Sequence, residues 1–364
     1  MEELGGKILT VVIPAYNMEN YISKCCSSLV IDNNFGALEV LIINDGSTDM
    51  TSEIAHGFAK DYPEVFRVID KENGNYGSCV NRGLGEARGV FIKILDGDDS
   101  FNNNEFEGYV RFLIDVERKF LDKVDLIITD RCIVDGDGVI KEQKSYDFSG
   151  EKIYDINKIS CLKGAGITQH SVTYRTKKLV DMGYEQLEGV SYTDQEWVLS
   201  PLLSMENFIY YPHSIYLYLV GRAGQTIEPK TRMDNFWMQI IIKKHLLRFY
   251  VKKKDLYPTK NQVLVKKRLV HYLNDIYKYY LMENREKTTN EILKFDIFLK
   301  KEYPDFYILM EKVKYKKWYP VKYIKYWRAG INGSMWKYNM IYVIYSLLHK
   351  GVVTVKRIRN NLKI

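Results

Sequence analysis

Short apolar runs alternate with amphipathic stretches through the first half of the chain. Five runs are rich in apolar and β-branched residues, as strands buried on both faces are: residues 8–13 (ILTVVI), 39–44 (EVLIIN), 65–69 (VFRVI), 90–95 (VFIKIL) and 126–129 (LIIT). The stretches between them place apolar residues at helical spacing, as do Ile22, Cys25, Cys26 and Leu29. Connections of this length suit parallel crossovers. The pattern predicts an α/β fold, with an open, mostly parallel sheet flanked by helices.

Polar residues directly follow three of these strands. Residues 14–17 (PAYN) follow the first, Asp45 the second, and Asp96, Asp98 and Asp99 the fourth. The C-terminal ends of parallel strands lie along one edge of a sheet, where open α/β sheets bind ligands. A single Asp at a strand end is more often a turn former or a helix cap. Carboxylates from several strands at one edge are better suited to a cation or to ribose hydroxyls.

The segment Asp96-Gly97-Asp98-Asp99 is the most informative motif. Carboxylates two residues apart on a turn can point at one hard cation, while Gly97 lets the backbone bend. Mg²⁺ or Mn²⁺ is the chemical match, and either ion can bridge to a diphosphate. A second copy, Asp135-Gly136-Asp137, lies in a polar hairpin-like stretch, so we interpret it as a structural turn.

Several common sites are excluded. No Gly-rich dinucleotide fingerprint follows the first strand, and GxxxxGK[ST] and HExxH are absent. The five cysteines contain no CxxC pair, which argues against a cysteine zinc site and against a secreted disulfide scaffold. No run reaches the roughly 18–20 apolar residues of a membrane span. We expect a reduced, cytoplasmic protein.

Charge divides the chain. Of its 364 residues, 53 are Lys or Arg and 46 are Asp or Glu. Residues 1–240 have a net charge of −13, whereas residues 241–364 have a net charge of +20 and hold 15 of the 29 tyrosines. We therefore predict two domains, 1–230 with the site and 231–364 as a basic, mainly α-helical region.

Lysines interleaved with aromatic residues, as in 312–327 (KVKYKKWYPVKYIKYW), are typical of a membrane surface, but also of a helical bundle with a solvated basic face. Nucleic acid could use the same chemistry, although we do not expect it as a partner. Residues 340–348 (MIYVIYSLL) fit an interfacial anchor or a buried helix. Our hypothesis is peripheral contact with the inner face of the plasma membrane.

Five segments, in this order and at these separations, resemble the family 2 glycosyltransferases with the GT-A fold: VVIPAYNMENYI, LIINDGSTDMT, ENGNYGSCVNRGLGEARG, VFIKILDGDD and TDQEW. The resemblance covers about residues 7–225. It implies inverting transfer of a sugar from a nucleoside-diphosphate sugar to an acceptor hydroxyl, with Mg²⁺ or Mn²⁺ as cofactor. It also implies a saccharide or lipid-linked acceptor, in the synthesis of bacterial cell-surface polysaccharide or glycolipid.

Residue by residue, the resemblance implies a nucleotide-sugar site that includes Pro14, Ala15, Tyr16, Glu19, Asp45, Gly77, Asp96, Arg222 and Gln225. Asp45 would accept a hydrogen bond from uracil, which favours UDP. Asp98 would bind the metal, and Asp96 would face the metal or the ribose. The family often has Arg immediately before the position of Asn81, where this chain has Val80; Arg82 is a candidate substitute.

Asp194, in TDQEW, matches the catalytic base of the family. A carboxylate on the far side of the sugar from the metal can take the proton that the acceptor hydroxyl loses during attack. From the residues alone, capping the helix that residues 196–203 predict is the commoner role, and Thr193 and Asp194 both suit it. Both roles are compatible, because capping would fix the carboxylate at the rim of a cleft.

Two other functions remain open from the residues. A sugar nucleotidyltransferase also places metal-binding carboxylates on an α/β sheet, but PAYNMEN lacks the glycines and basic residues of its phosphate loop. A non-catalytic role, in binding to membrane or nucleic acid, would account only for the basic C-terminal part. The donor sugar, the acceptor and the linkage cannot be inferred from the sequence.

Overall fold

The computed structural model describes residues 6–33, 35–150, 152–161, 166–222, 225, 229–283, 289–316, 319–331, 333 and 335–361. The chain divides into two compact units, Met1–Val265 and Lys266–Ile364. Helices α7 (Pro229–Asp234) and α8 (Phe236–Lys253) belong to the first unit, although the sequence groups most of their residues with the C-terminal region.

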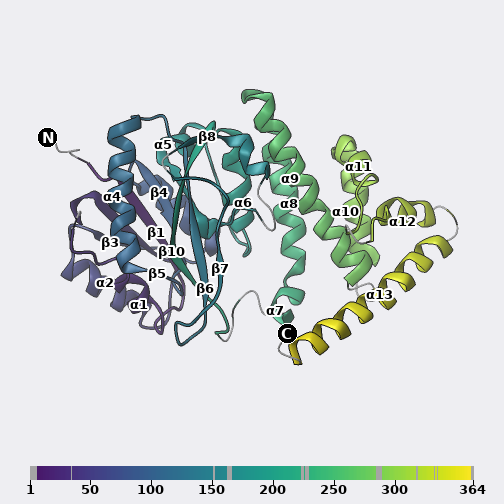
Figure 1. Ribbon diagram of the computed structural model, residues 1–364, viewed down its shortest axis with the longest axis horizontal. Coiled ribbons are helices and arrows are strands. Elements are labelled where there is room, and N and C mark those ends of the chain that lie inside the picture. The colour runs from purple at the N-terminus through teal and green to yellow at the C-terminus, as the bar shows by residue number, and fades with distance from the viewer. Residues whose placement is uncertain are drawn as a thin grey trace. The chain divides into compact units, whose positions relative to one another are not determined.

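A mixed sheet organises the first unit (Figure 1). Its order is β3 (Phe66–Asp70), β2 (Leu38–Asn44), β1 (Leu9–Ala15), β4 (Phe91–Ile94), β9 (Val172–Arg175), β6 (Leu126–Val134), β10 (Asn207–Leu219) and β5 (Ser100–Phe101). Strand β7 (Ile140–Lys144) pairs with β6, and β8 (Ile153–Asp155) pairs with β10. The first four strands are parallel, as predicted, so their C-terminal ends meet at one edge.

Antiparallel pairing begins at β9, which lies between β4 and β6. The apolar pattern of the sequence does not predict β9 or β10. Strand β10 contains Pro212 and changes register with β6 between Tyr211 and Ser214, so it lacks an uninterrupted apolar run. The turn at Asp135-Gly136-Asp137 joins β6 to β7, in agreement with the hairpin that the sequence suggested.

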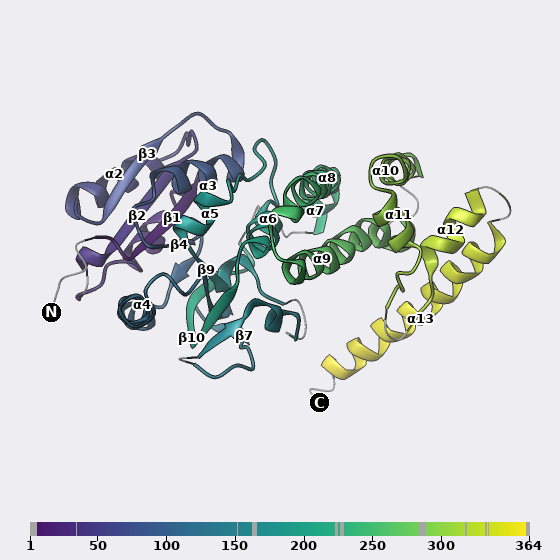
Figure 2. The same ribbon diagram turned by 90° about the horizontal axis from the view of Figure 1, so that it is seen from above.

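Helices cover both faces of the sheet. Helices α1 (Ile22–Ser27), α2 (Thr51–Asp61) and α4 (Asn103–Phe120) contribute to one core with β1, whereas α3 (Asn75–Glu86) packs on the other face. Figure 2 shows α3 and α4 on opposite sides of the sheet. The backbone of α3 comes close to β1, because a Cβ on Gly83 would lie only 2.4 Å from a methyl carbon of Val12.

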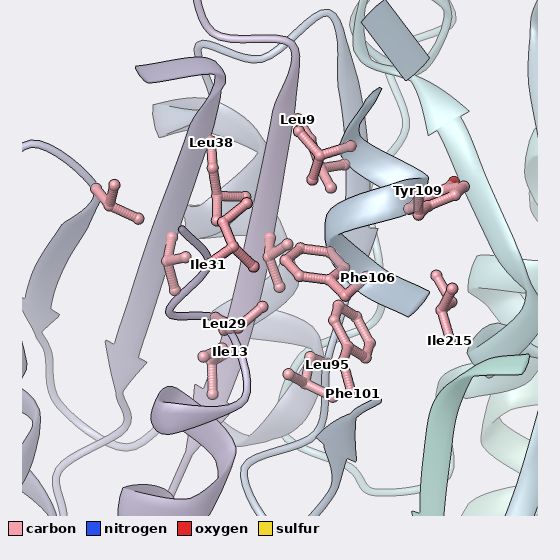
Figure 3. Packing of buried hydrophobic residues seen from close by; sticks show 14 of the residues in the cluster. Leu9, Ile13, Leu29, Ile31, Leu38, Leu95, Phe101, Phe106, Tyr109 and Ile215 are labelled. Atoms are coloured by element: carbon pink, nitrogen blue, oxygen red, sulfur yellow. The ribbon is translucent and has the colours of Figure 1, made fainter. Parts of the chain in front are cut away.

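The core between the sheet and α4 is continuous (Figure 3). Leu9 and Ile13 on β1 belong to the same cluster as Phe106 on α4, and Tyr109 lies one turn further along that helix. All four side chains are fully buried. Alternate residues of β1 therefore face α4, and the residues between them face α3, which explains why this strand is apolar on both sides.

The second unit is helical where it is described. It contains most of α9 (Thr259–Lys278), together with α10 (Thr289–Glu302), α11 (Pro304–Met310), α12 (Tyr323–Ile331) and α13 (Trp336–Asn361). Its core includes a buried ion pair between Arg328 Nη2 and Asp296 Oδ1 at 2.6 Å, and the Tyr277 hydroxyl donates to the same oxygen. Among the described residues, no helix is both long and apolar enough to cross a membrane.

Candidate active site

A cavity of about 350 Å³ lies at the C-terminal ends of β1, β2 and β4. Eight of the predicted site residues line it: Pro14, Ala15, Tyr16, Asp45, Asp96, Asp98, Arg222 and Gln225. The chain turns sharply around this cavity, because Asn17, Gly46 and Asn75 all have positive φ angles, between 53° and 72°. Positive φ at asparagine is concentrated at turns and functional sites. The edge that the strand pattern predicted is therefore hollowed and holds the predicted residues.

Asp45 is fixed at the wall of the cavity by donors to one of its oxygens. Oδ1 accepts hydrogen bonds from Lys71 Nζ at 2.5 Å and from the backbone N–H of Gly74 at 3.0 Å. The side chain of Asn73 donates to the backbone carbonyl of Asp45. These contacts hold a buried carboxylate in one orientation.

Neutral donors hold two of the three carboxylates in the acidic turn. Asp96 accepts from the Tyr76 hydroxyl at 2.6 Å and from Gln169 Nε2 at 2.8 Å. Asp99 accepts from the Tyr216 hydroxyl at 2.6 Å and from the backbone N–H of Leu219 at 2.8 Å. Burial, and then the neighbouring carboxylates, raise the pKa of both groups. The contacts of Asp99 with Tyr216 and Leu219 tie the acidic turn to β10.

Asp98 has a cationic partner instead. Its Oδ2 accepts from Arg222 Nε at 2.5 Å, and the Arg222 guanidinium lies 5.4 Å from the centre of the Tyr21 ring. The Asp98 and Arg222 side chains are both largely buried, and both residues line the cavity. The arrangement shows that a positive charge is accommodated beside Asp98, on the cavity side of the acidic turn.

Two sets of residues could hold a divalent cation. Ligand atoms of Asp96, Asp99 and His170 lie within 4.8 Å of one another, and burial lowers the pKa of His170 to about 3, so its imidazole is neutral. However, the oxygens of both carboxylates already accept the hydrogen bonds described above. Asp98 fits a cation better, because it faces the cavity and carries a charged partner that a metal could replace.

Asp194 begins α6 (Asp194–Leu199), two residues after a strained residue. Tyr192 has a φ of 67°, and Thr193 occupies the N-cap position. The residue is exposed, yet desolvation by the surrounding protein raises the pKa of its carboxyl group to about 6. Asp194 does not form part of the cavity wall. It is close enough to Asp96 and Tyr76 on that wall to raise the pKa of both groups.

Helix α8 supplies charges behind α6 that the sequence gave no reason to expect. Lys243 is 2% exposed, and its ammonium donates to the side-chain oxygens of Gln195 and Gln239. Its charge opposes the effect of burial on the pKa of Asp194. His245 Nδ1 lies 2.6 Å from Glu196 Oε1, which raises the pKa of His245. Contacts from Lys243 and His245 on α8 thus hold the start of α6 in place.

Besides Asp194, two predicted site residues are outside the cavity wall. Glu19 is exposed and accepts a hydrogen bond from the backbone N–H of Met50, while Met18 lines the cavity. Gly77 packs against the segment that leads to α6, because a Cβ there would lie 2.0 Å from the carbonyl oxygen of Leu187. Their predicted contacts with a nucleotide sugar stay predictions.

Val80 and Arg82, at the departure from the family pattern, both lie outside the cavity wall. Val80 is 1% exposed and packs in the interior. Arg82 is half exposed and pairs with Glu86 one turn along α3, at 3.0 Å between Nη2 and Oε1.

Comparison with known proteins identifies the N-terminal part of the chain. The family model for glycosyl transferase family 2 matches residues 10–125. An uncharacterized glycosyltransferase of Mycoplasma pneumoniae, the MG025 homolog, is 41% identical over 103 residues, which cover 28% of this chain and 34% of the relative. The uncharacterized glycosyltransferase EpsJ of Bacillus subtilis is 34% identical over 117 residues, 32% of this chain and 33% of the relative. The matches thus span about a third of these relatives.

The fold has solved counterparts over nearly its whole length. S. aureus TarS 1–349, crystallised in complex with UDP-GlcNAc, superimposes with a TM-score of 0.63 at 19% identity, covering 93% of this chain and 92% of TarS 1–349. Together with the mixed sheet and its strand-end cavity, the likeness confirms the predicted GT-A-type fold. Residues 10–125, which match the glycosyl transferase family 2 model, thus lie within a fold of the GT-A type.

Proposed function

We propose that the protein is an inverting glycosyltransferase, which moves a sugar from a nucleoside-diphosphate sugar to an acceptor hydroxyl. The observation that carries this proposal is one cavity lined by Asp45, Asp96 and Asp98, with Asp194 beside it. The family 2 match of residues 10–125 gives the reaction class.

The donor is a UDP-sugar in this proposal. Asp45 Oδ1 is held by Lys71 and Gly74, so the carboxylate is oriented to accept the N–H of uracil. Pro14, Ala15 and Tyr16 form the adjoining wall, where the base and the ribose would lie. The complex of TarS 1–349 with UDP-GlcNAc supports a uridine nucleotide in a cavity of this fold.

Asp194 is the proposed base. The acceptor oxygen bonds to the anomeric carbon as the bond from that carbon to the diphosphate oxygen breaks, and Asp194 takes the hydroxyl proton. The electron pair of the broken bond leaves on the nucleoside diphosphate. Because the acceptor attacks opposite the leaving group, one displacement inverts the anomeric centre. A carboxyl pKa of about 6 suits this work, since the group is ionised at neutral pH and still basic.

Asp98 would hold Mg²⁺ or Mn²⁺, with Asp96 nearby. When bound, the cation would neutralise charge on the departing diphosphate. The residues present fit it, since Asp98 already holds the positive charge of Arg222 at the cavity. Arg222 and Gln225, on the same cavity wall, would face the diphosphate.

The acceptor is a saccharide or a lipid-linked saccharide in this proposal, within cell-surface polysaccharide or glycolipid synthesis. The enzyme would work from the cytoplasm, peripherally at the inner face of the plasma membrane. The net charge of +20 in residues 241–364 supports this placement, because it complements anionic lipid headgroups.

Release of nucleoside diphosphate tests the proposal directly. The protein is incubated with UDP-, GDP- and dTDP-sugars and Mn²⁺, with and without EDTA, and the free nucleotide is measured. We expect release from a UDP-sugar, loss of that release with EDTA, and a loss of about 10²–10⁴-fold in Asp194→Asn.

Asp98→Asn should lose activity. Asp137→Asn is the matched control, because Asp137 occupies the same place in the second Asp-Gly-Asp segment. It should keep activity, since that segment is an exposed turn. Full activity in Asp98→Asn and Asp194→Asn would refute the assigned roles. Pyrophosphate release from a nucleoside triphosphate would instead indicate a nucleotidyltransferase.

A further inference from the structure

A stripe of apolar side chains lies exposed along α13. Four residues form it, each at least half exposed: Trp336, Met340, Val343 and Leu347. They are spaced by four, three and four residues, so they lie on one face of the helix. We call them the α13 stripe. Ile344 and Leu348, beside it, are also exposed.

The opposite face of α13 is anchored within its own unit. Tyr338, Ile341 and Tyr345 are buried. The Tyr338 hydroxyl donates to the carbonyl oxygen of Leu281 at 2.5 Å, and the Tyr319 hydroxyl donates to that of Ile341 at 3.0 Å. The helix is therefore fixed in rotation, and the exposure of the stripe follows from how this unit packs.

Every charged residue in the sequence around the stripe is cationic. Residues 312–364 contain 13 Lys and Arg and no Asp or Glu. Lys337 is exposed next to the stripe, with Nζ 5.6 Å from the centre of the Trp336 ring. Lys325 on the neighbouring α12, and Lys322 just before that helix, are also exposed. An apolar stripe combined with basic residues and interfacial aromatics is the pattern of a helix that lies in the plane of a membrane surface.

We infer that the α13 stripe docks on an anionic phospholipid surface. The stripe enters the boundary between headgroups and acyl chains, and the surrounding lysines contact lipid phosphates. A second copy of the chain is a poorer occupant, because it would bring two cationic regions together without a single carboxylate from residues 312–364 between them. Nucleic acid would use the lysines but leave the stripe in water. The inference goes beyond the proposed membrane location, since it names the face and the lipid class.

Vesicle co-sedimentation of the full chain tests the inference. The probes are vesicles of phosphatidylcholine alone and of phosphatidylcholine mixed with phosphatidylglycerol. We expect binding only to the mixed vesicles, and weakening as salt is added, because screening shortens the reach of the lysines. The double variant Met340→Gln and Leu347→Gln should bind about tenfold more weakly or worse, since two buried apolar side chains are lost.

The matched control is Ile297→Gln with Ile308→Gln, which removes two equally exposed apolar residues from α10 and α11. It should bind like the wild type, and both double variants should keep the wild-type thermal midpoint. Equal binding to both vesicle types, or no effect of the stripe substitutions, would overturn the inference. So would a dimer, detected by light scattering, that the stripe substitutions dissociate.

Donor hydrolysis in vesicle-free solution separates this inference from the proposed function. The stripe variant should hydrolyse a UDP-sugar at the wild-type rate, because none of its residues lines the cavity. An inactive wild type that binds mixed vesicles would refute the function and keep the inference. An active wild type that binds no vesicles would do the reverse.

Discussion

Among single residues, Asp194 is the one expected to set the pH dependence of kcat/KM. Its pKa is raised to about 6 by desolvation, so the fraction of ionised base falls as the pH drops through 6. If Asp194 accepts the proton, kcat/KM should decline on the acid side with an apparent pKa near this value. Kinetics across the range of about pH 5–8 measure it.

Lys243→Met should move that acid limb to higher pH. The ammonium on α8 favours the charged carboxylate, opposing burial, whereas Glu196, Asp96 and the hydroxyls of Tyr76 and Tyr218 remain in place around Asp194. Lys252→Met, at the exposed end of the same helix, is the control and should leave the profile unchanged. An unshifted acid limb in Lys243→Met would show that Lys243 acts on packing alone.

Lys93 gives a second pH-dependent quantity, the free energy of unfolding. It is fully buried on β4 and donates to the carbonyls of His170 and Val172, and burial lowers its pKa to about 7. Between pH 7 and its ordinary pKa of 10.5, the unfolded chain binds the extra proton, so Lys93 makes stability rise with pH.

Lys93→Met should remove that rise, which is at most about 1.4 kcal/mol per pH unit. Denaturant unfolding of both proteins at several pH values between 7 and 9 gives the difference in slope, in which all other titrating groups cancel. Identical slopes would contradict a buried, largely neutral Lys93.

The predictability of the site depends on where each residue stands in the chain. Asp45, Asp96 and Asp98 follow apolar strands directly, so the strand pattern and the family resemblance both identified them. Gln169 and Lys243 reach the site from segments far away in sequence. They hold neighbouring groups through hydrogen bonds, and a single polar residue in a polar segment or a basic helix carries no such signal.

Among the helices, α3 contains a built-in comparison between two glycines. Gly77→Ala would place a Cβ 2.0 Å from the Leu187 carbonyl, whereas a Cβ on Gly85 meets no atom within 4 Å. We expect Gly77→Ala to destabilise the protein by about 1–3 kcal/mol through overpacking, and Gly85→Ala to stabilise it by about 0.5–1 kcal/mol.

Denaturant midpoints of the two alanine variants measure both effects. Gly77→Ala should also weaken binding of UDP, because Asn75 and Tyr76 at the start of α3 line the cavity. Equal midpoints would mean that the 186–188 segment moves aside without cost.

Strands were predictable where they are uniformly apolar. Strands β1, β2 and β4 are buried along their whole length, and their sequences show it. Strand β10 is 13 residues long, but its mixed burial and its break near Pro212 leave no periodic signal. Antiparallel β9 is four residues long, and its place between β4 and β6 depends on pairing distant in sequence.

For the whole molecule, occupation of the cavity should be visible as stability. A ligand that binds only the folded state adds about 2.7 kcal/mol at one hundred times its Kd. UDP with Mg²⁺ should therefore raise the thermal midpoint, and Asp45→Asn should lose most of this shift relative to its own midpoint without ligand. An equal shift in Asp45→Asn would remove the role assigned to Asp45.

The sequence predicted the character of the C-terminal part, but not the boundary between the two compact units. Composition alone predicted a basic, mainly helical C-terminal region, which the described helices confirm. Where the compact units divide depends on packing, because α8 is joined to the first unit by buried contacts such as Lys243 to Gln195. Charge counting carries no such information.

The absence of acidic side chains from residues 312–364 would separate lipid attachment from turnover in the proposed enzyme. Those residues hold no carboxylate side chain whose charge acid could remove, whereas the carboxyl group of Asp194 has a pKa of about 6. Mild acidification would therefore silence Asp194 while the protein stays adsorbed to lipid. Raised ionic strength would instead weaken lipid binding and leave the active site competent. Turnover and lipid binding would therefore respond to different conditions, turnover to pH and lipid binding to salt.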